Sequence, residues 1–297
     1  MVTKSHCRFV FRLKRFAAQL THATCTVSNP QSILREHNLQ ALKRFGQNFV
    51  INPAVFDKVI AALPEDARVL EIGPGLGALT RRLLDSQKLD CVNEIDRGLI
   101  EILSRQFPGL KIIQGDFLEQ DSRQLSQNNF NCVVGNLPFY ITTDILLKII
   151  RELPQVETAI LGVQWEFAQR AAAATGSSLA LFLQAAGDVT LLGKTDRKSF
   201  YPAPEVDAGW LLYRRAPKVR DLAVFEILTR GLFWGKRKNI GNTIRKNPHF
   251  AMHEVSKDWA STDLSSLAEI TALRPDALNW ELVYKLFCTL YPAEATK

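Results

Sequence analysis

Long apolar runs and paired cysteines are both missing from this 297-residue chain. No run approaches the about 20 apolar residues that a helix needs to cross a bilayer, so the sequence predicts a soluble protein with no membrane partner. The five cysteines include no C-x-x-C pair and do not cluster with the five histidines, so we expect neither a metal site nor a disulfide framework. At 46% hydrophobic residues, the chain can bury one large core and a smaller one.

Acidic residues are missing before Glu36, so the first 44 residues hold eight Lys or Arg against one acid, and the rest holds 29 of each sign. The overall charge of +7 therefore says little about the folded body. Phe9, Leu13, Phe16 and Leu20 recur at helical spacing among arginines, which is typical of a transit peptide. A disordered basic arm is the alternative. We exclude residues 1–25 from the fold and expect a cytoplasmic protein, or a mitochondrial or plastid one if this segment directs import.

A second stretch without acids lies between Glu226 and Glu254. It contains six bases: Arg230, Lys236, Arg237, Lys238, Arg245 and Lys246. On charge alone the stretch is either a solvated helix face or a surface for nucleic acid.

Short β-rich runs alternate with helical patterns over the first two thirds of the chain. The expected strands are residues 68–72, 89–93, 110–114, 131–135, 158–163, 189–193 and 209–213. The expected helices between them are residues 78–86, 97–106, 143–151 and 166–174. This alternation predicts an α/β, Rossmann-like fold, with a mostly parallel seven-stranded sheet and helices on both faces.

The pattern changes near the end of the sheet. The last two expected strands flank the loop 200–207, which predicts an antiparallel edge. After Arg215 strand signals stop and helical patterns continue to Leu290. We therefore divide the chain into a larger domain, residues 26–215, and a small C-terminal helical domain, residues 216–297.

A glycine-rich turn, Gly73-Pro-Gly-Leu-Gly77, follows the first buried strand of the sheet and precedes a helix. Glycines let the backbone approach a ligand closely, and ligands of such sheets bind at the carboxyl ends of the strands. The spacing Gly73-x-Gly75-x-x-Ala78 also matches a loose dinucleotide fingerprint, with Glu94 as the acid for a ribose. From this turn alone, a nicotinamide cofactor and S-adenosylmethionine are equally acceptable.

Polar residues at three further strand ends favour S-adenosylmethionine. Glu71 precedes the glycines, where an acid suits a cationic ligand, and Asp116 follows the third strand, where a carboxylate can accept from an adenine amino group. Asn136-Leu-Pro-Phe139 closes the fourth strand and has no use in a dehydrogenase. Each acid alone is also compatible with a helix cap, but their regular placement at successive strand ends argues against coincidence.

The Asn136 turn suits methyl transfer to an adenine amino group, a poor nucleophile because its lone pair is delocalised. Two acceptors on its N–H bonds favour the tetrahedral nitrogen that the reaction needs. Asn136 Oδ1 and the backbone carbonyl of Leu137 or Pro138 are the candidates, and Phe139 offers a face on which an extruded base can stack. The alternative is an ordinary strand-to-helix turn with a buried phenylalanine.

Taken together, the motifs resemble those of the small-subunit ribosomal RNA adenine dimethyltransferases, the KsgA family, from about Ser32 to Asn247. The motifs that carry the resemblance are residues 43–49, 71–77, 93–96, 115–116, 135–142, 164–170, 200–207 and 235–239.

The resemblance implies the following roles. Asn48 and Val50 help to hold the methionine end of S-adenosylmethionine, Gly73 lies against the cofactor, Glu94 binds the ribose hydroxyls, Asp116 contacts the adenine, and Asn136 serves both cofactor and target. It also implies a monomer that dimethylates two adjacent adenosines in a hairpin near the 3′ end of small-subunit rRNA, on an immature subunit. The basic stretch would then hold RNA phosphates.

Several positions depart from the family pattern, and most of them concern RNA contacts. Phe139 replaces the commoner Tyr, Trp165 and Glu205 replace Lys, and Asn239 and Gly241 weaken a basic run. Three rival functions stay open: a large-subunit methyltransferase of the macrolide-resistance type, an organelle transcription or RNA-binding factor of the same descent, and a nicotinamide dehydrogenase.

Overall fold

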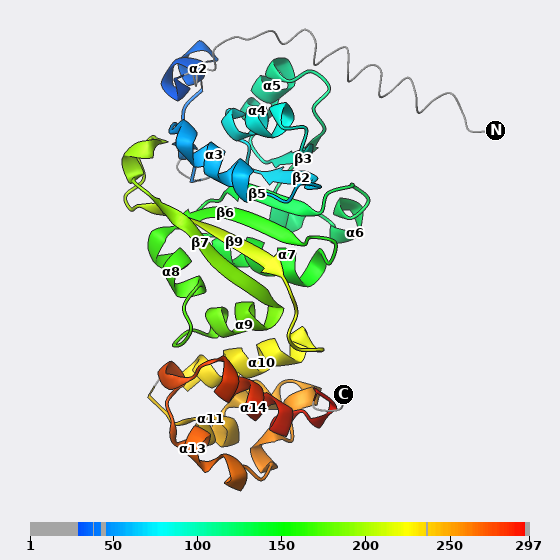
Figure 1. Ribbon diagram of the computed structural model, residues 1–297, viewed down its shortest axis with the longest axis vertical. Coiled ribbons are helices and arrows are strands. Elements are labelled where there is room, and N and C mark those ends of the chain that lie inside the picture. The colour runs from blue at the N-terminus through cyan, green and yellow to red at the C-terminus, as the bar shows by residue number, and fades with distance from the viewer. Residues whose placement is uncertain (1–28, 38, 43–45, 236, 295–297) are drawn as a thin grey trace, which may run out of the picture.

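The computed structural model describes residues 29–37, 39–42, 46–235 and 237–294. A central sheet with helices on both faces lies next to a group of helices from the last quarter of the chain (Figure 1). The predicted extension over residues 1–25 lies outside the described residues, and so does Lys236. No helix in the described ranges is long and apolar enough to span a membrane.

The sheet has seven strands in the order β4-β3-β2-β5-β6-β9-β7. Their bounds are β2 (Val69–Ile72), β3 (Leu89–Glu94), β4 (Ile112–Gln114), β5 (Cys132–Asn136), β6 (Thr158–Gln164), β7 (Gly187–Thr195) and β9 (Ala208–Arg215). The first five are parallel, whereas β9 is antiparallel to both β6 and β7. The predicted fold class is confirmed, including the antiparallel edge.

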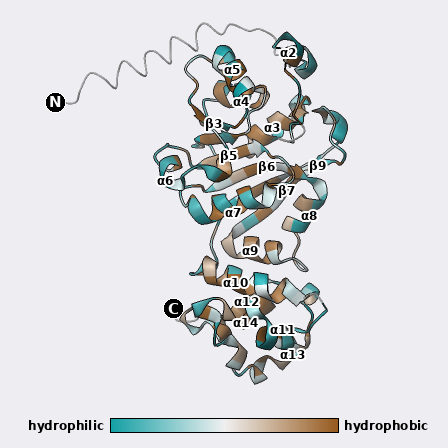
Figure 2. Cartoon of the chain, turned by 180° about the vertical axis from the view of Figure 1, so that it is seen from behind, coloured by the Kyte–Doolittle hydropathy of each residue, from teal (hydrophilic) through white to brown (hydrophobic). Residues whose placement is uncertain are grey.

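Helices pack on the two faces of this sheet. One face carries α3 (Pro53–Ala62), α4 (Ala78–Asp85) and α5 (Arg97–Gln106), and the other carries α7 (Thr142–Glu152), α8 (Trp165–Ala171) and α9 (Ser178–Ala186). The strands are mostly brown in Figure 2, while teal residues lie on the surrounding helices, α6 (Ser122–Leu125) and α7 among them. Alternate strand residues enter two separate cores, with Val133 facing α7 and Val134 facing α3 and α4.

Two of the helices that cover the sheet faces, α9 and α3, were not expected from the sequence. The sequence of α9, Ser178–Ala186, is apolar on nearly every side, and six of its nine residues are buried. A helix without a polar face shows no 3.6-residue alternation, so periodicity does not reveal it. α3 was also missed, and it begins with an Asn52 side chain that accepts from Ala54 N.

The helical part of the chain follows β9 and has its own core. Its helices are α10 (Leu222–Leu232), α11 (Ile240–Lys246), α12 (Pro248–Ala251), α13 (Ala268–Ala272) and α14 (Trp280–Leu290). Short 3-10 turns lie between and after them: Phe233–Gly235, Glu254–Ser256, Trp259–Ser261, Ser265–Leu267, Pro275–Ala277 and Pro292–Glu294. This core includes Leu181 and Ala185 of α9, so it continues onto the sheet's covering layer. That residues 216–297 form a separate domain stays a prediction.

A small ribbon closes one end of the sheet. β1 (Phe49–Val50) pairs antiparallel with β8 (Phe200–Tyr201), and Ile51 N donates to Ser199 O at 2.8 Å. A 3-10 turn, Arg197–Ser199, precedes β8, and the helix α2 (Pro30–Glu36) lies before β1 in the chain. The ribbon brings the segment 46–50 beside strand ends that are far from it in sequence.

Candidate active site

A cavity of about 410 Å³ opens at the carboxyl ends of the parallel strands. Its walls come from the segment 46–50, the glycine-rich turn after β2, the end of β3, and Asn136 with Pro138 after β5. The volume lies within the range of small-molecule sites, roughly 300–1,000 Å³, so a ligand of nucleoside size fits. Of the predicted cofactor residues, Asn48, Val50, Gly73, Glu94 and Asn136 line it.

The glycine-rich turn has positive φ at all three glycines. A Cβ on Gly75 would lie 2.9 Å from the ring of Phe49, and one on Gly77 would lie 2.5 Å from the ring of Phe107. By contrast, a Cβ on Gly73 would meet nothing within 4 Å. Packing therefore requires glycine at 75 and 77, while the backbone of Gly73 faces open space where a ligand can approach.

Glu94 ends β3 with a side chain that is only 4% exposed. Its Oε1 accepts from the backbone N–H groups of Ile95 and Asp96, both at 2.9 Å, and its Oε2 accepts from Gly75 N at 3.3 Å. Burial raises the pKa of this carboxyl, and the three N–H donors oppose that rise. A carboxylate has about four acceptor positions, so one is left for a hydroxyl donor such as a ribose.

Glu71 lies deeper, at 2% exposed, and its Oε2 accepts from Thr80 Oγ1 at 2.7 Å. Burial raises the pKa of Glu71 to about 8. The carboxyl is therefore mostly protonated at neutral pH in the free protein. A cationic ligand in the cavity would favour its carboxylate form and lower that pKa.

The segment 46–50 is tied directly to the Asn136 turn. Asn136 Nδ2 donates to the backbone carbonyl of Asn48 at 2.8 Å, and Asn48 Nδ2 donates to Gly46 O at 3.1 Å. A Cβ on Gly46 would lie 3.1 Å from Pro138 Cβ, so the two segments touch. Val50 is buried and pairs with Phe200. The cavity wall thus joins residues that are 88 positions apart in sequence.

The polar atoms of the Asn136 turn have different partners. Asn136 Oδ1 is buried and has no hydrogen-bond partner within the described ranges. Leu137 N donates to Gly162 O at 2.9 Å. Pro138 O accepts from Ile141 N at 3.2 Å and from Thr142 Oγ1 at 3.3 Å, so this carbonyl is hydrogen-bonded to the start of α7. Of the two candidate carbonyls, that of Leu137 is the more available acceptor.

Three predicted site side chains do not line the cavity. Leu137 is 2% exposed and belongs to the core on the α7 face, which leaves only its backbone for a site. Phe139 is half-buried against the opposite core. Asp116 follows β4, where its Oδ1 accepts from Leu118 N at 2.9 Å and caps the 3-10 turn Phe117–Glu119. Base stacking by Phe139 and adenine binding by Asp116 stay predictions.

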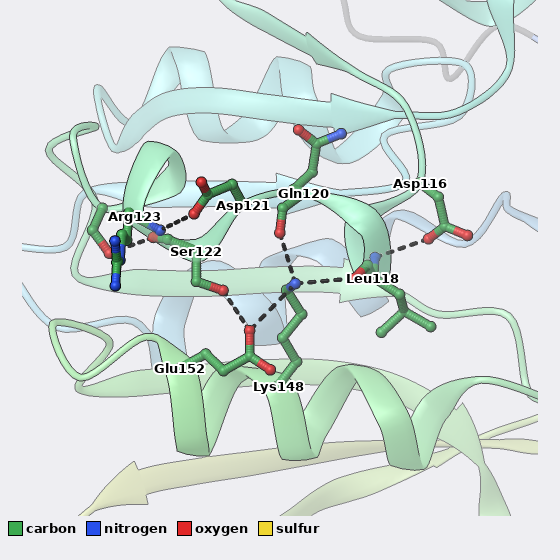
Figure 3. Close-up of polar contacts among 9 residues, drawn as sticks. Asp116, Leu118, Gln120, Asp121, Ser122, Arg123, Lys148 and Glu152 are labelled. Carbon is green, nitrogen blue, oxygen red and sulfur yellow. Dashed lines mark hydrogen bonds and ion pairs between the residues drawn. The ribbon is translucent and has the colours of Figure 1, made fainter.

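Figure 3 shows a buried lysine that holds the turn after Asp116. Lys148 of α7 is 8% exposed, and its Nζ donates to Leu118 O at 3.0 Å and to Gln120 O at 2.7 Å. Glu152, one turn further along α7, lies 3.4 Å from this ammonium. A hydrogen bond from Ser122 is the main cause that lowers the pKa of the Glu152 carboxyl. The helix that follows the Asn136 turn therefore also positions the turn that carries Asp116.

Lys148 was not predicted as a functional residue, because a single lysine in an amphipathic helix is usually solvated. Trp210 of β9, which lines the cavity at 3% exposure, was not predicted either. No local signal distinguishes either residue, since their partners come from distant strands and turns.

The five described members of the basic stretch are all exposed and lie in the helical part. Arg230 lies in the last turn of α10, Arg237 and Lys238 follow that helix, and Arg245 and Lys246 are the last two residues of α11. None of them lines the cavity.

Part of this basic surface has partners of its own. Arg230 lies 3.4 Å from Glu226, which also pairs with Arg151 of α7. Lys238 Nζ lies 5.0 Å above the ring of Trp234, a side chain that is 56% exposed. The end of α10 lies on the same side of the molecule as the carboxyl ends of the parallel strands (Figure 1).

Comparisons with known proteins agree with this geometry. The model of the family "Ribosomal RNA adenine dimethylase" matches residues 38–284. The ribosomal RNA small subunit methyltransferase A of Leuconostoc mesenteroides is 31% identical over 92% of this chain and 99% of that protein. The protein of the same name from Chlorobium luteolum is 35% identical over 85% of this chain and 91% of its own length. The resemblance found in the sequence is therefore confirmed.

Solved structures show the same fold. A dimethyladenosine transferase from Plasmodium falciparum superposes with a TM-score of 0.67 at 24% identity, covering 80% of this chain and 96% of that one. The 23S rRNA methyltransferase ErmE superposes with a TM-score of 0.58 at 26% identity, covering 80% of this chain and 98% of that one.

Proposed function

The chain belongs to the ribosomal RNA adenine dimethylase family, and on this premise we propose its substrate and site. It is an rRNA adenine dimethyltransferase. It transfers methyl groups from S-adenosylmethionine to the N6 amino groups of two adjacent adenosines in a hairpin near the 3′ end of 16S rRNA, during assembly of the small subunit.

The observation that carries this proposal is the unpartnered Asn136 Oδ1 in the wall of the cavity. Its amide orientation is set by the bond from Nδ2 to Asn48 O, so the oxygen is the atom left to accept from a target amine. The carbonyl of Leu137 is the second acceptor. Two acceptors on the amino group favour its tetrahedral form, which is the form that attacks a methyl carbon.

The cofactor side of the cavity supports the same reaction. The bound cofactor would supply an electrophilic sulfonium methyl group. The backbone of Gly73 would approach it closely, Glu94 would accept from its ribose hydroxyls, and Asn48 and Val50 would enclose its methionine end. Asp116 would contact the adenine ring from the neighbouring turn, which Lys148 holds in place.

The RNA would bind across the basic surface of the helical part, residues 216–297. Exposed guanidinium and ammonium groups contact phosphates without reading sequence, so they would orient the RNA while the sheet supplies the chemistry. Arg237, Lys238, Arg245 and Lys246 would make these contacts, together with Lys236 and Arg230.

We expect tritiated methyl groups to enter immature small subunits and to be recovered as dimethyladenosine. Asn136→Ala should lower kcat by about a hundredfold or more, because it removes an acceptor that acts on the reacting amine. Its affinity for small-subunit RNA should stay within twofold. Asn129→Ala, which changes an exposed asparagine outside the cavity, is the matched control. Full activity of Asn136→Ala would refute the site.

A second candidate substrate is large-subunit rRNA, because ErmE is 26% identical over 80% of this chain. Incubation with purified 16S and 23S rRNA, followed by mapping of the methylated adenines, separates the two. Methylation confined to the 23S RNA would replace the small-subunit proposal.

The proposal extends to the state and place in which the protein works. It acts as a monomer on the immature small subunit, in the cytoplasm or, if residues 1–25 direct import, in an organelle. Light scattering during gel filtration tests whether the protein is a monomer. A fluorescent protein fused after residue 25 tests whether this segment directs import.

A further inference from the structure

Three neighbouring strands place Asn136, Gly162 and Trp210 in one row across the sheet. Asn136 of β5 pairs with Gly162 of β6, and Gly162 pairs with Trp210 of β9. Residues that pair across neighbouring strands point to the same face of a sheet. The next strand, β7, continues the row with Gly193 opposite Trp210. Asn136 and Trp210 are therefore separated only by a residue that has no side chain.

Both side chains reach into the space above that glycine. A Cβ placed on Gly162 would lie 2.8 Å from Asn136 Oδ1, 3.0 Å from Trp210 Cζ2 and 3.2 Å from Trp210 Cε2. Cε2 is bonded to both Nε1 and Cζ2, so the edge of the indole that carries the N–H lies close to Gly162, as Asn136 Oδ1 does. Any larger residue at position 162 would displace one of the two side chains.

Each side chain brings an unsatisfied polar atom to this place. Trp210 Nε1 and Asn136 Oδ1 are both buried, and neither has a hydrogen-bond partner within the described ranges. Buried polar atoms without partners are uncommon in native structures, and a catalytic role or a bound group is one of their explanations. Both residues line the cavity, so one bound group could satisfy the donor and the acceptor together.

Adenine carries the complementary pair, an acceptor beside a donor, on either of its two edges. Its amino group is a donor, and it lies between the acceptors N1 and N7. We propose that Trp210 determines specificity for the target base by donating its Nε1–H to the adenine ring nitrogen beside the amino group, while that amino group donates to Asn136 Oδ1. A small rotation of the two side chains toward an entering base is required, because both atoms are covered in the free protein. Guanine, which carries an acceptor in place of the amine, would face Asn136 Oδ1 with a second acceptor.

This inference rests on the proposed function and adds to it the residue that reads the base. The direct test uses Trp210→Phe, which keeps an aromatic ring in the row and removes the N–H donor together with part of the indole. The substrate is a synthetic RNA hairpin with two adjacent adenosines, made also with 1-deazaadenosine or 7-deazaadenosine at both positions. Each analogue replaces one ring nitrogen by C–H and leaves the amino group in place.

We expect Trp210→Phe to lower kcat/KM on the adenosine hairpin by about tenfold, the effect of one hydrogen bond. The wild-type protein should lose about the same factor on one of the two analogues. On that analogue Trp210→Phe should cause no further loss, because the bond is already missing. If the losses caused by Trp210→Phe and by the analogue multiply, the indole N–H donates to Asn136 instead of the base. If kcat/KM is unchanged in Trp210→Phe, the indole N–H donates to neither. Either result overturns the inference.

Two controls separate this outcome from unfolding and from failure of the proposed function. Trp259→Phe makes the same change at a site that is also 3% exposed but belongs to the helical core, and it should leave the analogue ratios unchanged. S-adenosylhomocysteine affinity, measured by calorimetry, should be the same for Trp210→Phe and wild type. If the wild-type protein methylates neither the hairpin nor small subunits, the proposed function fails; if it methylates them and Trp210→Phe is unaffected, only the inference fails.

Discussion

The cavity at the sheet edge and the basic surface of the helical part use polar groups in opposite ways. At the cavity, Glu71, Glu94 and Asn136 are wholly or largely buried, and backbone or side-chain hydrogen bonds fix their positions. On the helical part, the described bases are exposed. Each buried polar group interacts strongly because little solvent screens it. Each exposed charge interacts weakly, so several are needed to bind a ligand. The chemistry and the RNA affinity should therefore respond to different changes.

Among changes that separate the cavity from the basic surface, Gly77→Ala should have the largest effect on stability and cofactor affinity. A Cβ at position 77 would lie 2.5 Å from Phe107, and φ there is +82°, so the turn must shift. We expect a loss of about 2–4 kcal/mol in stability and roughly a hundredfold weaker S-adenosylhomocysteine binding, as overpacking and backbone strain add. Urea unfolding and calorimetry measure the two quantities.

Gly109→Ala is the matched control for that change. Gly109 has φ of +86° but nothing within 4 Å of its Cβ position, so only the backbone strain remains. A loss of about 1–2 kcal/mol with unchanged ligand affinity is expected. Equal ligand affinities for the two variants would contradict the role of packing at Gly77.

The next effect concerns pH and is confined to the cavity. The pKa of Glu71 is about 8 in the folded protein against a usual value of 4.5. Between these values the folded state holds a proton that the unfolded state has released, so this carboxyl lowers the unfolding free energy as pH rises from 4.5 to 8 and adds no slope above 8. The slope is at most roughly 1.4 kcal/mol per pH unit.

Glu71→Gln removes that ionisation. The stability of Glu71→Gln relative to wild type should therefore rise between pH 5 and 8 and then level off, as followed by urea unfolding at each pH. Glu65→Gln changes an exposed glutamate nearby and should give a smaller change. A difference that stays constant with pH would contradict the buried, protonated carboxyl.

The smallest effect should come from the basic surface. Arg245→Ala combined with Lys246→Ala should raise the KM for RNA by about three- to tenfold and flatten its salt dependence by roughly one to two phosphate contacts. S-adenosylhomocysteine affinity should not change. Lys257→Ala, outside the basic stretch and paired with Glu254, is the control. An equal effect of Lys257→Ala would mean that net charge alone, rather than this surface, binds the RNA.

Most of the sheet could be predicted from local pattern. Each of the seven expected strands is present, since runs such as Thr158–Gln164 are apolar and bounded by turns. α9 was missed because its apolar residues surround the helix, and the ribbon of β1 and β8 was missed because two-residue strands have no readable period. Of the candidate residues, Gly73 on the glycine turn, Glu94 at the end of β3 and Asn136 at the end of β5 line the cavity, and Leu137, Asp116 and Phe139 do not.

Local sequence patterns were sufficient to define the strand ends and the chemistry that each carries, because glycine turns, caps and apolar periods act over a few residues. The three-dimensional packing was needed to show that Pro138 O has hydrogen-bond donors while Asn136 Oδ1 has none among the described residues, that burial raises the pKa of Glu71, and that Trp210 and Asn136 both lie close to Gly162. The reason is that partners, burial and proton affinity depend on neighbours from distant strands, and strand order and register bring those neighbours together.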